Sequence, residues 1–281
     1  MSPVPSLFCF GLGYTATRLA QRLLADGWRV GGTARDDAQR SALCALGIEA
    51  RPFEGLSVEA LAGYRHLLTS VPPASEGDPV LHRYRATIRE LPDLRWVGYL
   101  STTGVYGDAQ GAWVDEDHPV APNTERSRRR VTAEAVWLEL GPPVHVFRLS
   151  GIYGPGRSTL DSVRAGHARR LVKPGHVFNR CHVDDLVSVL VASLERPRPG
   201  AIYNVADETP APMADVVTCA CELLGVEPPP VQRIDEADCT PAMASYFLSN
   251  RRIRSARIQH ELGVRLQYPD YRAGLEAIAR G

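Results

Sequence analysis

The chain has 281 residues, of which 44% are hydrophobic and 23% are charged, and its 32 basic residues balance 32 acidic ones. This length suits one large domain or two closely joined ones. A formal net charge of zero, with no basic block, argues against nucleic acid and anionic membranes as partners. No apolar run reaches the roughly 18 residues of a membrane span.

The N-terminal segment and the cysteines indicate a cellular compartment. The segment Met-Ser-Pro-Val-Pro has no basic flank and leads directly into a predicted strand, so it does not read as a signal peptide. The six cysteines form neither a C-x-x-C motif nor a paired framework. We therefore expect a cytoplasmic protein with reduced cysteines.

A nucleotide-binding pattern occupies residues 7–35. An apolar strand over Leu7–Phe10 is followed by the spacing G-x-G-x-x-A and by an amphipathic helix over Thr15–Ala25. In such a turn the first glycine allows a sharp bend, the second lets backbone amides approach a pyrophosphate, and the small third residue lets the helix pack closely. The N-terminus of the helix offers free N–H groups to a phosphate. The expected cofactor contacts of this turn are Gly11, Gly13, Tyr14, Thr15 and Ala16.

The second strand, expected over Trp28–Thr33, suggests which cofactor is bound. NAD-preferring sites usually place an acidic residue at this strand end, whereas NADP sites accept a phosphate there through arginine. Here Arg35 can pair bidentately with that phosphate and Thr33 can add a hydroxyl. The alternative is a solvated arginine, because Asp36 and Asp37 follow directly. We expect NADP as the cofactor, with NAD as the alternative.

Strands and helices continue to alternate up to residue 149. The expected helices are Asp37–Leu46, Val58–Ala62, Pro79–Glu90 and Thr124–Leu140, and the expected strands are Ile48–Phe53, His66–Val71, Trp96–Ser101 and Val144–Leu149. This alternation predicts an α/β protein with a doubly wound parallel-sheet Rossmann fold. Ligands bind beyond the carboxyl ends of such strands. Ser70 is therefore a candidate cofactor contact, and Thr102, Thr103 and Tyr106 are candidates for the substrate site.

Four motifs carry a family resemblance. They are YLSTTGVYGD (99–108), RLSGIYGPGR (148–157), HVDDL (182–186) and YNVAD (203–207). In this order they resemble the extended short-chain dehydrogenase/reductase superfamily, which contains sugar-nucleotide epimerases and dehydratases. The resemblance implies that Thr102, four residues before the tyrosine of V-Y-G, orients the substrate. It also implies that the G-I-Y-G-P-G element passes near the nicotinamide.

The chain departs from this family at the catalytic Y-x-x-x-K pair. Counting back from Ala133-Glu134 places the two positions at Arg126 and Arg130. Arginine cannot exchange a proton near neutral pH, so ordinary tyrosine-dependent hydride transfer is not expected. Arg130 can still bind a ribose or phosphate, and Arg126 lies one helical turn away on the same side. The alternative is a solvated arginine face.

Other groups could replace the missing tyrosine. Tyr106 and Tyr153 follow strand ends, although each is also explained as an aromatic wall beneath its loop. His182 lies close to Asp184 and Asp185, which could suggest a metal site. The acids suit a helix N-terminus better, and we expect no metal.

We expect the chain to divide into two parts. Residues 1–157 and 180–207 would form the dinucleotide-binding domain, and residues 158–179 and 208–281 would form a small α-rich C-terminal lobe that binds the substrate. This lobe would contain helices at Met213–Leu224 and Ile253–Leu262. The resemblance implies that basic residues in and directly beside this lobe hold an anionic group, although each one alone is equally well explained as a solvated cation. The candidates are Arg157, Lys173, Arg180, Arg251 and Arg252.

The sequence thus favours an NADP-binding oxidoreductase of an atypical extended short-chain type, acting on a small substrate that is anionic or sugar-like. Two alternatives stay open: a non-catalytic module that senses NADP(H), and a nucleotide-sugar epimerase or dehydratase. The resemblance also implies a homodimer formed through the helices at 79–90 and 124–140. The second helix carries Val131, Ala135 and Leu138 on one face.

Overall fold

The computed structural model describes residues 4–91 and 93–281. The chain divides into two compact units. Unit 1 comprises Met1–Thr102, Glu125–Arg148 and Leu186–Tyr203, and unit 2 comprises Thr103–Thr124, Leu149–Asp185 and Asn204–Gly281. The expected division by function, with a cofactor domain and a substrate lobe, stays a prediction.

Unit 1 is built on a seven-stranded sheet in the order β11-β7-β5-β4-β1-β2-β3. The strands are β1 (Ser6–Phe10), β2 (Arg29–Thr33), β3 (Glu49–Arg51), β4 (His66–Thr69), β5 (Trp96–Thr102), β7 (Val144–Leu149) and β11 (Ile202–Val205). The pairs β1–β2, β2–β3, β1–β4 and β4–β5 are parallel. The strand order reverses between β1 and β4, which places the ligand crevice of a doubly wound sheet at their carboxyl ends. The predicted fold class is confirmed.

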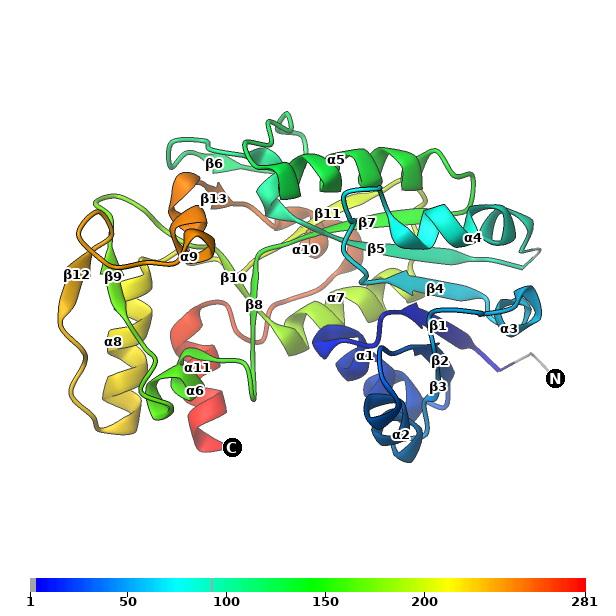
Figure 1. The fold of residues 1–281 in the computed structure, drawn as a ribbon, viewed down its shortest axis with the longest axis horizontal. Helices are drawn as coiled ribbons and strands as arrows, with labels where there is room; N and C mark the ends of the chain where they lie inside the picture. The colour runs from blue at the N-terminus through cyan, green and yellow to red at the C-terminus, as the bar shows by residue number, and fades with distance from the viewer. Residues whose placement is uncertain (1–3, 92) are drawn as a thin grey trace. The chain divides into compact units, whose positions relative to one another are not determined.

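Helices cover both faces of this sheet (Figure 1). Their bounds are α1 (Tyr14–Ala25), α2 (Asp37–Ala45), α3 (Val58–Ala62), α4 (Pro79–Glu90), α5 (Glu125–Leu138) and α7 (Val183–Glu195). Helices α4 and α5 lie on one face, and α1 and α7 lie on the other (Figure 1). Phe8, Tyr99 and Trp137 belong to one buried cluster that joins the sheet to the α4–α5 face.

The start of α4 illustrates how local sequence sets an element. Asp78 is the N-cap, and its Oδ1 accepts the amides of Val80 at 2.9 Å and Leu81 at 3.1 Å. Pro79 occupies the first helical position, where its missing N–H has no cost. The second oxygen of Asp78 accepts the Trp137 indole N–H of α5 at 3.0 Å. One carboxylate therefore begins α4 and ties it to α5.

Unit 2 combines short strands with further helices. Its elements are η1 (Thr103–Tyr106), β6 (Trp113–Val114), β8 (Gly151–Tyr153), α6 (Thr159–Arg164), β9 (Arg170–Val172), β10 (Arg180–His182), α8 (Met213–Leu224), β12 (Val231–Arg233), α9 (Pro241–Ser245), η2 (Tyr246–Leu248), β13 (Arg252–Ile253), α10 (Ala256–Leu262) and α11 (Tyr271–Arg280). The strands pair as β8 with β10, β9 with β12 and β6 with β13. Leu160 of α6, Ala220 of α8 and Leu275 of α11 lie in the core of this unit.

One sequence expectation is corrected here. The helix predicted over Ile253–Leu262 begins only at Ala256, as α10. Ile253 instead pairs with Val114 in the β13–β6 ladder and is 1% exposed. Its apolar side chain fits a helical period as well as it fits a strand, so periodicity alone could not place the boundary.

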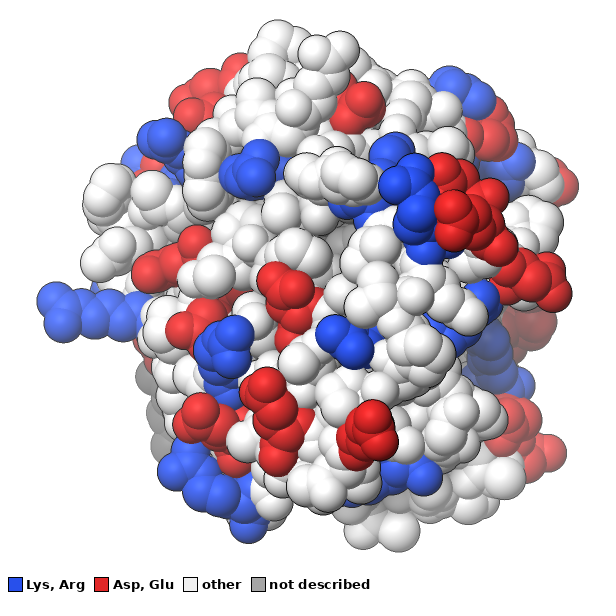
Figure 2. Space-filling view, turned by 90° about the vertical axis from the view of Figure 1, so that its left-hand side faces the viewer, with Lys and Arg blue, Asp and Glu red and all other residues white. Residues whose placement is uncertain are grey.

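Two general expectations can be compared with the structure. In the described part of the chain no helix is long and apolar enough to cross a bilayer. Figure 2 shows basic and acidic side chains intermingled over the face in view. This distribution agrees with the balanced charge of the sequence.

Candidate functional site

The turn after β1 is held from three sides. The Gly11 amide donates to Thr33 Oγ1 at 2.9 Å, and the Leu12 amide donates to the Thr33 carbonyl at 2.7 Å. Ser70 Oγ donates to the Gly11 carbonyl at 2.6 Å. Gln39 Nε2 donates to the Leu12 carbonyl at 3.1 Å. Residues from β2, α2 and the end of β4 thus fix the backbone of the glycine-rich turn.

Gly11 and Gly13 are needed for different reasons. Gly11 has φ +87°, and a Cβ there would lie 2.9 Å from Ser70 Oγ, so backbone and packing both require glycine. Gly13 is exposed at an ordinary extended backbone conformation, and a Cβ there would meet nothing within 4 Å. The space in front of Gly13 is open, as close approach of a ligand to the backbone requires.

Gly13 is also the N-cap of α1, and no side chain caps the helix. The first turn carries no acidic residue. The amides at this end and the helix dipole therefore favour an anion. Arg18, whose guanidinium lies 5.9 Å from the Tyr14 ring centroid, adds a cation one turn into the helix. The arrangement fits a dinucleotide pyrophosphate. Arg18 and Gln39 are contributors that sequence reasoning missed, because neither belongs to the glycine motif.

At the end of β2 the structure separates Thr33 from Arg35. Thr33 is 2% exposed, and its hydroxyl accepts from the turn, so it supports the turn from within. Arg35 is exposed, and its amide donates to Gln39 Oε1 at 3.2 Å. Arg40 Nη1 lies 3.4 Å from the carbonyl of Arg35. The Arg40 guanidinium, which also pairs with Asp37, therefore lies at the strand end beside the Arg35 backbone.

The two altered catalytic positions lie in different environments. Arg126 is exposed, whereas Arg130 is 8% exposed. Arg130 Nη1 donates to the Leu100 carbonyl at 2.6 Å and to the Tyr99 hydroxyl at 3.2 Å. Burial raises the pKa of Tyr99, which keeps the phenol neutral. Arg130 thus ties α5 to β5 two residues before Thr102, which is half-buried at the strand end.

A buried ion pair lies one turn further along α5. Arg148 Nη2 of β7 contacts Glu134 Oε2 at 2.8 Å, and the two side chains are 6% and 5% exposed. Ser101 Oγ donates to the other oxygen of Glu134. Glu134 and Arg130 together fasten the ends of β5 and β7 to α5.

Tyr106 is committed to the interior of unit 2. It is 1% exposed, and its hydroxyl donates to Asn204 Oδ1 at 2.8 Å. Asn204 is fully buried, and its amide nitrogens donate to Glu116 Oε1 at 2.8 Å and to the Arg254 carbonyl at 3.1 Å. Thr103, also buried, lies 3.4 Å through its hydroxyl from the Leu149 carbonyl. These contacts order the turn that follows Thr102 in the chain.

Tyr153 is packed as a wall. It is 8% exposed, its hydroxyl lies 3.4 Å from the Asp270 carbonyl, and burial raises its pKa. The ring packs directly against Gly274 of α11. A Cβ at position 274 would lie only 2.7 Å from two of the ring carbons, so this packing requires glycine. A phenol with a raised pKa is a weak proton donor at neutral pH, so this geometry favours a supporting role.

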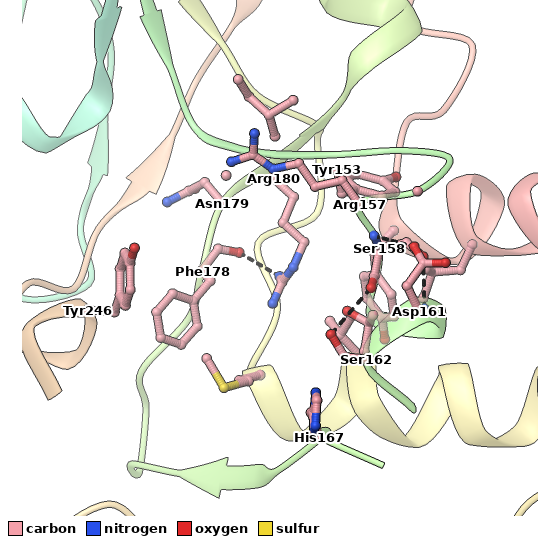
Figure 3. A pocket seen from close by; sticks show the side chains of 18 of the residues that line it. Tyr153, Arg157, Ser158, Asp161, Ser162, His167, Phe178, Asn179, Arg180 and Tyr246 are labelled. Atoms are coloured by element: carbon pink, nitrogen blue, oxygen red, sulfur yellow. Dashed lines mark hydrogen bonds between the residues drawn. The ribbon is translucent and has the colours of Figure 1, made fainter. Parts of the chain in front are cut away.

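A cavity of about 600 Å³ lies within unit 2, beside the G-I-Y-G-P-G element (Figure 3). Arg157 and Arg180 both line it, together with His167 and the rings of Phe178 and Tyr246. In Figure 3 the Arg180 guanidinium reaches into the middle of the cavity, between Phe178 and the Ser158–Ser162 segment. Aromatic walls with a few cations are typical of small-molecule sites.

Arg180 is fixed in place. Its Nη1 donates to the Phe178 carbonyl at 3.0 Å and to the Ala211 carbonyl at 3.2 Å, and the guanidinium carbon lies 6.0 Å from the Tyr271 ring centroid. Burial lowers its pKa from a very high ordinary value, so it stays charged at neutral pH. A cation held rigidly in a cavity binds an anion without first losing side-chain freedom.

The remaining candidates have other partners. Arg251 is half-buried, and its Nη1 donates to the Gly107 carbonyl at 2.7 Å. Lys173 Nζ donates to the Phe247 carbonyl at 2.7 Å. Asp185 accepts the amides of Gln267 at 2.7 Å and Tyr268 at 3.0 Å. Among the described residues no cluster of three or more His, Cys, Asp or Glu side chains could hold a metal ion.

Comparison with known proteins gives the fold and its relatives. No protein-family model matches the chain. A conserved protein of unknown function from Silicibacter pomeroyi is 49% identical, with a TM-score of 0.94 over 99% of both chains. Protein YeeZ of Escherichia coli is 28% identical over 92% of this chain and 95% of its own length. The dTDP-glucose 4,6-dehydratase of Bacillus anthracis, solved in complex with NAD, is 18% identical with a TM-score of 0.78 over 99% of this chain and 96% of that one.

The strand order and the glycine turn define the chain as a protein with a doubly wound Rossmann fold. More narrowly, its relatives and structural neighbours include NAD-dependent epimerases and dehydratases, which fits a family like the extended short-chain dehydrogenases/reductases. The chain departs from the pattern of that family, since Arg126 and Arg130 stand where the resemblance places tyrosine and lysine.

Proposed function

We propose that the chain is an NADP(H)-dependent oxidoreductase acting on a small, anionic, sugar-like substrate. The observation that carries this proposal is Arg180, a fixed guanidinium in a cavity lined by aromatic rings. Arg157 on the same cavity adds a second cation. One solved structure with the same fold, MoeE5, holds UDP-glucuronic acid and NAD, and it is 18% identical to this chain with a TM-score of 0.76.

The cofactor side of the proposal rests on unit 1. Gly11, Gly13, Tyr14, Thr15 and Ala16 would hold the pyrophosphate, with Ser70 and Thr33 supporting the turn. Arg35 would pair with the 2′-phosphate, aided by Arg40. When bound, the nicotinamide supplies or accepts a hydride. Thr102 would orient the substrate hydroxyl or carbonyl, and Arg130 would hold β5 rather than exchange a proton.

Arg35→Ala tests the choice of cofactor. A charge-assisted bidentate contact is worth about 1.5–3 kcal/mol, so NADPH affinity should fall about tenfold or more while NADH affinity stays unchanged. Fluorescence titration of both cofactors measures this. The control is Arg51→Ala, which removes an arginine at the end of the neighbouring strand β3 and should leave both affinities unchanged. A change at Gln39 would not serve as a control, because Gln39 also holds the glycine turn. Equal affinities for NADPH and NADH in the wild type would contradict NADP preference.

One experiment distinguishes the oxidoreductase from an epimerase or dehydratase and from a non-catalytic sensing module. The ligands that co-purify with the protein are identified and then supplied to it, and turnover is measured. Net oxidation of NADPH supports the oxidoreductase. A tightly retained cofactor with an isomerised or dehydrated product supports an epimerase or dehydratase. Binding without turnover supports a sensing module. The loss of the tyrosine–lysine pair and the inward-facing hydroxyl of Tyr106 are the observations that keep this last alternative open.

We also propose a homodimer formed through α4 and α5. On α5, Val131 and Leu138 are only half-buried, and Ala135 is exposed, so this face offers apolar surface to a second copy. Light scattering at micromolar concentration should give twice the 30.7 kDa chain mass. Ala135→Glu, on α5, should shift the mass toward the monomer. Thr87→Glu, on α4, tests the other helix of the interface and should have the same effect. A monomeric wild type would rule the dimer out.

A further inference from the structure

Asp207 lies next to Arg180, two residues after the end of β11. Its backbone amide donates to the Arg180 carbonyl at 2.6 Å, and the residue is 3% exposed. The mechanism proposed above does not use this carboxyl group. An ionisable group so deeply buried beside the cation of a ligand cavity calls for a partner.

The Asp207 carboxylate has no such partner. Among the described residues, no donor meets either of its buried oxygens at hydrogen-bond geometry. The Arg180 guanidinium and the backbone amides of Arg180 and Thr209 favour its ionised form, and together they lower its pKa by less than burial raises it. The result is a pKa of about 8, against an ordinary value of 3.8. Asp207 can therefore change its charge just above neutral pH.

The charged and titratable surroundings of the pair are few. Asp207 is faced by Arg180 and Asp270, and its own charge acts on Tyr153. Arg180 is faced in addition by Tyr271 and Asp215. Asp207 also borders a second cavity, of about 740 Å³, whose lining includes the charged residues Glu208, Arg254 and Arg265. Burial raises the pKa of Tyr153 and of Tyr271, so both phenols stay neutral at the pH at which Asp207 changes its charge.

Resting on the proposed function of this cavity, we propose that Asp207 is a specificity-determining residue: an anion binds at Arg180 together with one proton taken up by the Asp207 carboxyl. No bond of the ligand breaks, since the step is the addition of one anion and one proton. With Asp207 protonated, Arg180 presents its full positive charge to the ligand. With Asp207 ionised, the carboxylate offsets that charge and repels the anion.

The sign of the pH dependence follows from this coupling. A bound anion favours the neutral carboxyl, so its presence raises the pKa of Asp207 above the value in the free protein. Affinity for the anion is then constant well below that value and falls as the pH rises through it. The fall approaches tenfold per pH unit at most, because one proton is involved. The cavity would thus take an anionic ligand readily at neutral pH and release it in alkali.

UDP is a suitable probe, because a phosphate completes its last ionisation near pH 6, so the charge of its diphosphate stays constant above pH 7.5, and the Asp207→Asn comparison corrects for any ionisation of the uracil ring. Affinity is measured between pH 7.5 and 9.5 for the wild type and for Asp207→Asn. We expect the wild-type affinity to fall about tenfold over this range. The variant should change less than about twofold and should bind UDP more tightly than the wild type at pH 9.5. A parallel fall in both proteins would overturn the role of Asp207.

Two controls separate this inference from the proposed function. If UDP fails to bind the wild type, or binds Arg180→Met equally well, the anion site itself is wrong. His167 also lines the cavity, and His167→Gln should keep the wild-type pH profile. Should Asp207→Asn not fold, calorimetry of the wild type at pH 8.5 in two buffers of different ionisation enthalpy still decides. It should report proton uptake on binding, and zero uptake would overturn the proposal.

Discussion

Replacing Gly13 with aspartate should abolish dinucleotide binding and leave the protein at least as stable. Gly13 has an extended backbone (φ −85°, ψ −168°) that any residue can adopt, and a Cβ there meets nothing within 4 Å. Aspartate is a preferred N-cap, and α1 should gain roughly a few tenths of a kcal/mol from it, since glycine is itself a tolerated N-cap. The same carboxylate would occupy and repel the proposed pyrophosphate position. NADPH affinity should fall at least about 100-fold, or about 2.7 kcal/mol.

The matched variant Gly13→Asn separates the two causes. Asparagine has the same size and caps a helix equally well, but it carries no charge. It should weaken binding through bulk alone, and less than aspartate does. Gly11→Ala is the opposite control, because its φ of +87° and its contact with Ser70 predict lower stability of the apo protein. Wild-type NADPH affinity in Gly13→Asp would show that the cofactor does not lie on this turn.

The sequence predicted the elements whose signals are local. Helices α4 and α8 have the bounds expected from the sequence, Pro79–Glu90 and Met213–Leu224. In the first case Asp78 and Pro79 mark the start, and in the second Gly225 ends the helix in a left-handed conformation. Capping residues and apolar period are contained within a dozen residues, so no tertiary information is needed.

Elements that depend on distant partners could not be found in this way. Strand β13 has two residues, and it exists because Arg252 and Ile253 pair with Trp113 and Val114 of β6. A segment this short carries no period of its own. The pairing is fixed only when the chain between the two segments has folded.

The candidate site shows the same division. Residue type and spacing pointed to the glycine turn, and the family resemblance pointed to Arg157, Arg180 and the altered α5 positions. They could not predict that Arg130 is buried against the Leu100 carbonyl while Arg126 is exposed. They also could not predict that the Thr33 hydroxyl serves the turn or that Asn204 receives the Tyr106 hydroxyl. A polar side chain's partner is set by tertiary packing.

The second large effect concerns the buried pair Glu134–Arg148. Replacing Glu134 with methionine keeps the side-chain volume but leaves the Arg148 guanidinium buried without its carboxylate. Removing one member of a buried ion pair typically costs about 3–5 kcal/mol, because the remaining charge stays desolvated. The Ser101 hydroxyl loses its acceptor in the same change. We expect the free energy of unfolding of Glu134→Met, measured with urea, to fall by about this amount.

The double variant Glu134→Met/Arg148→Met tests whether the uncompensated charge is the cause. With both charges gone, an apolar pair of similar size should recover much of the loss, since the desolvation cost of the pair is also removed. Arg129→Met, which breaks an exposed contact with Glu125 on the same helix, should cost less than about 1 kcal/mol. If Glu134→Met costs no more than Arg129→Met, the pair does not hold β7 to α5. If the double variant is as unstable as the single one, packing rather than charge accounts for the loss.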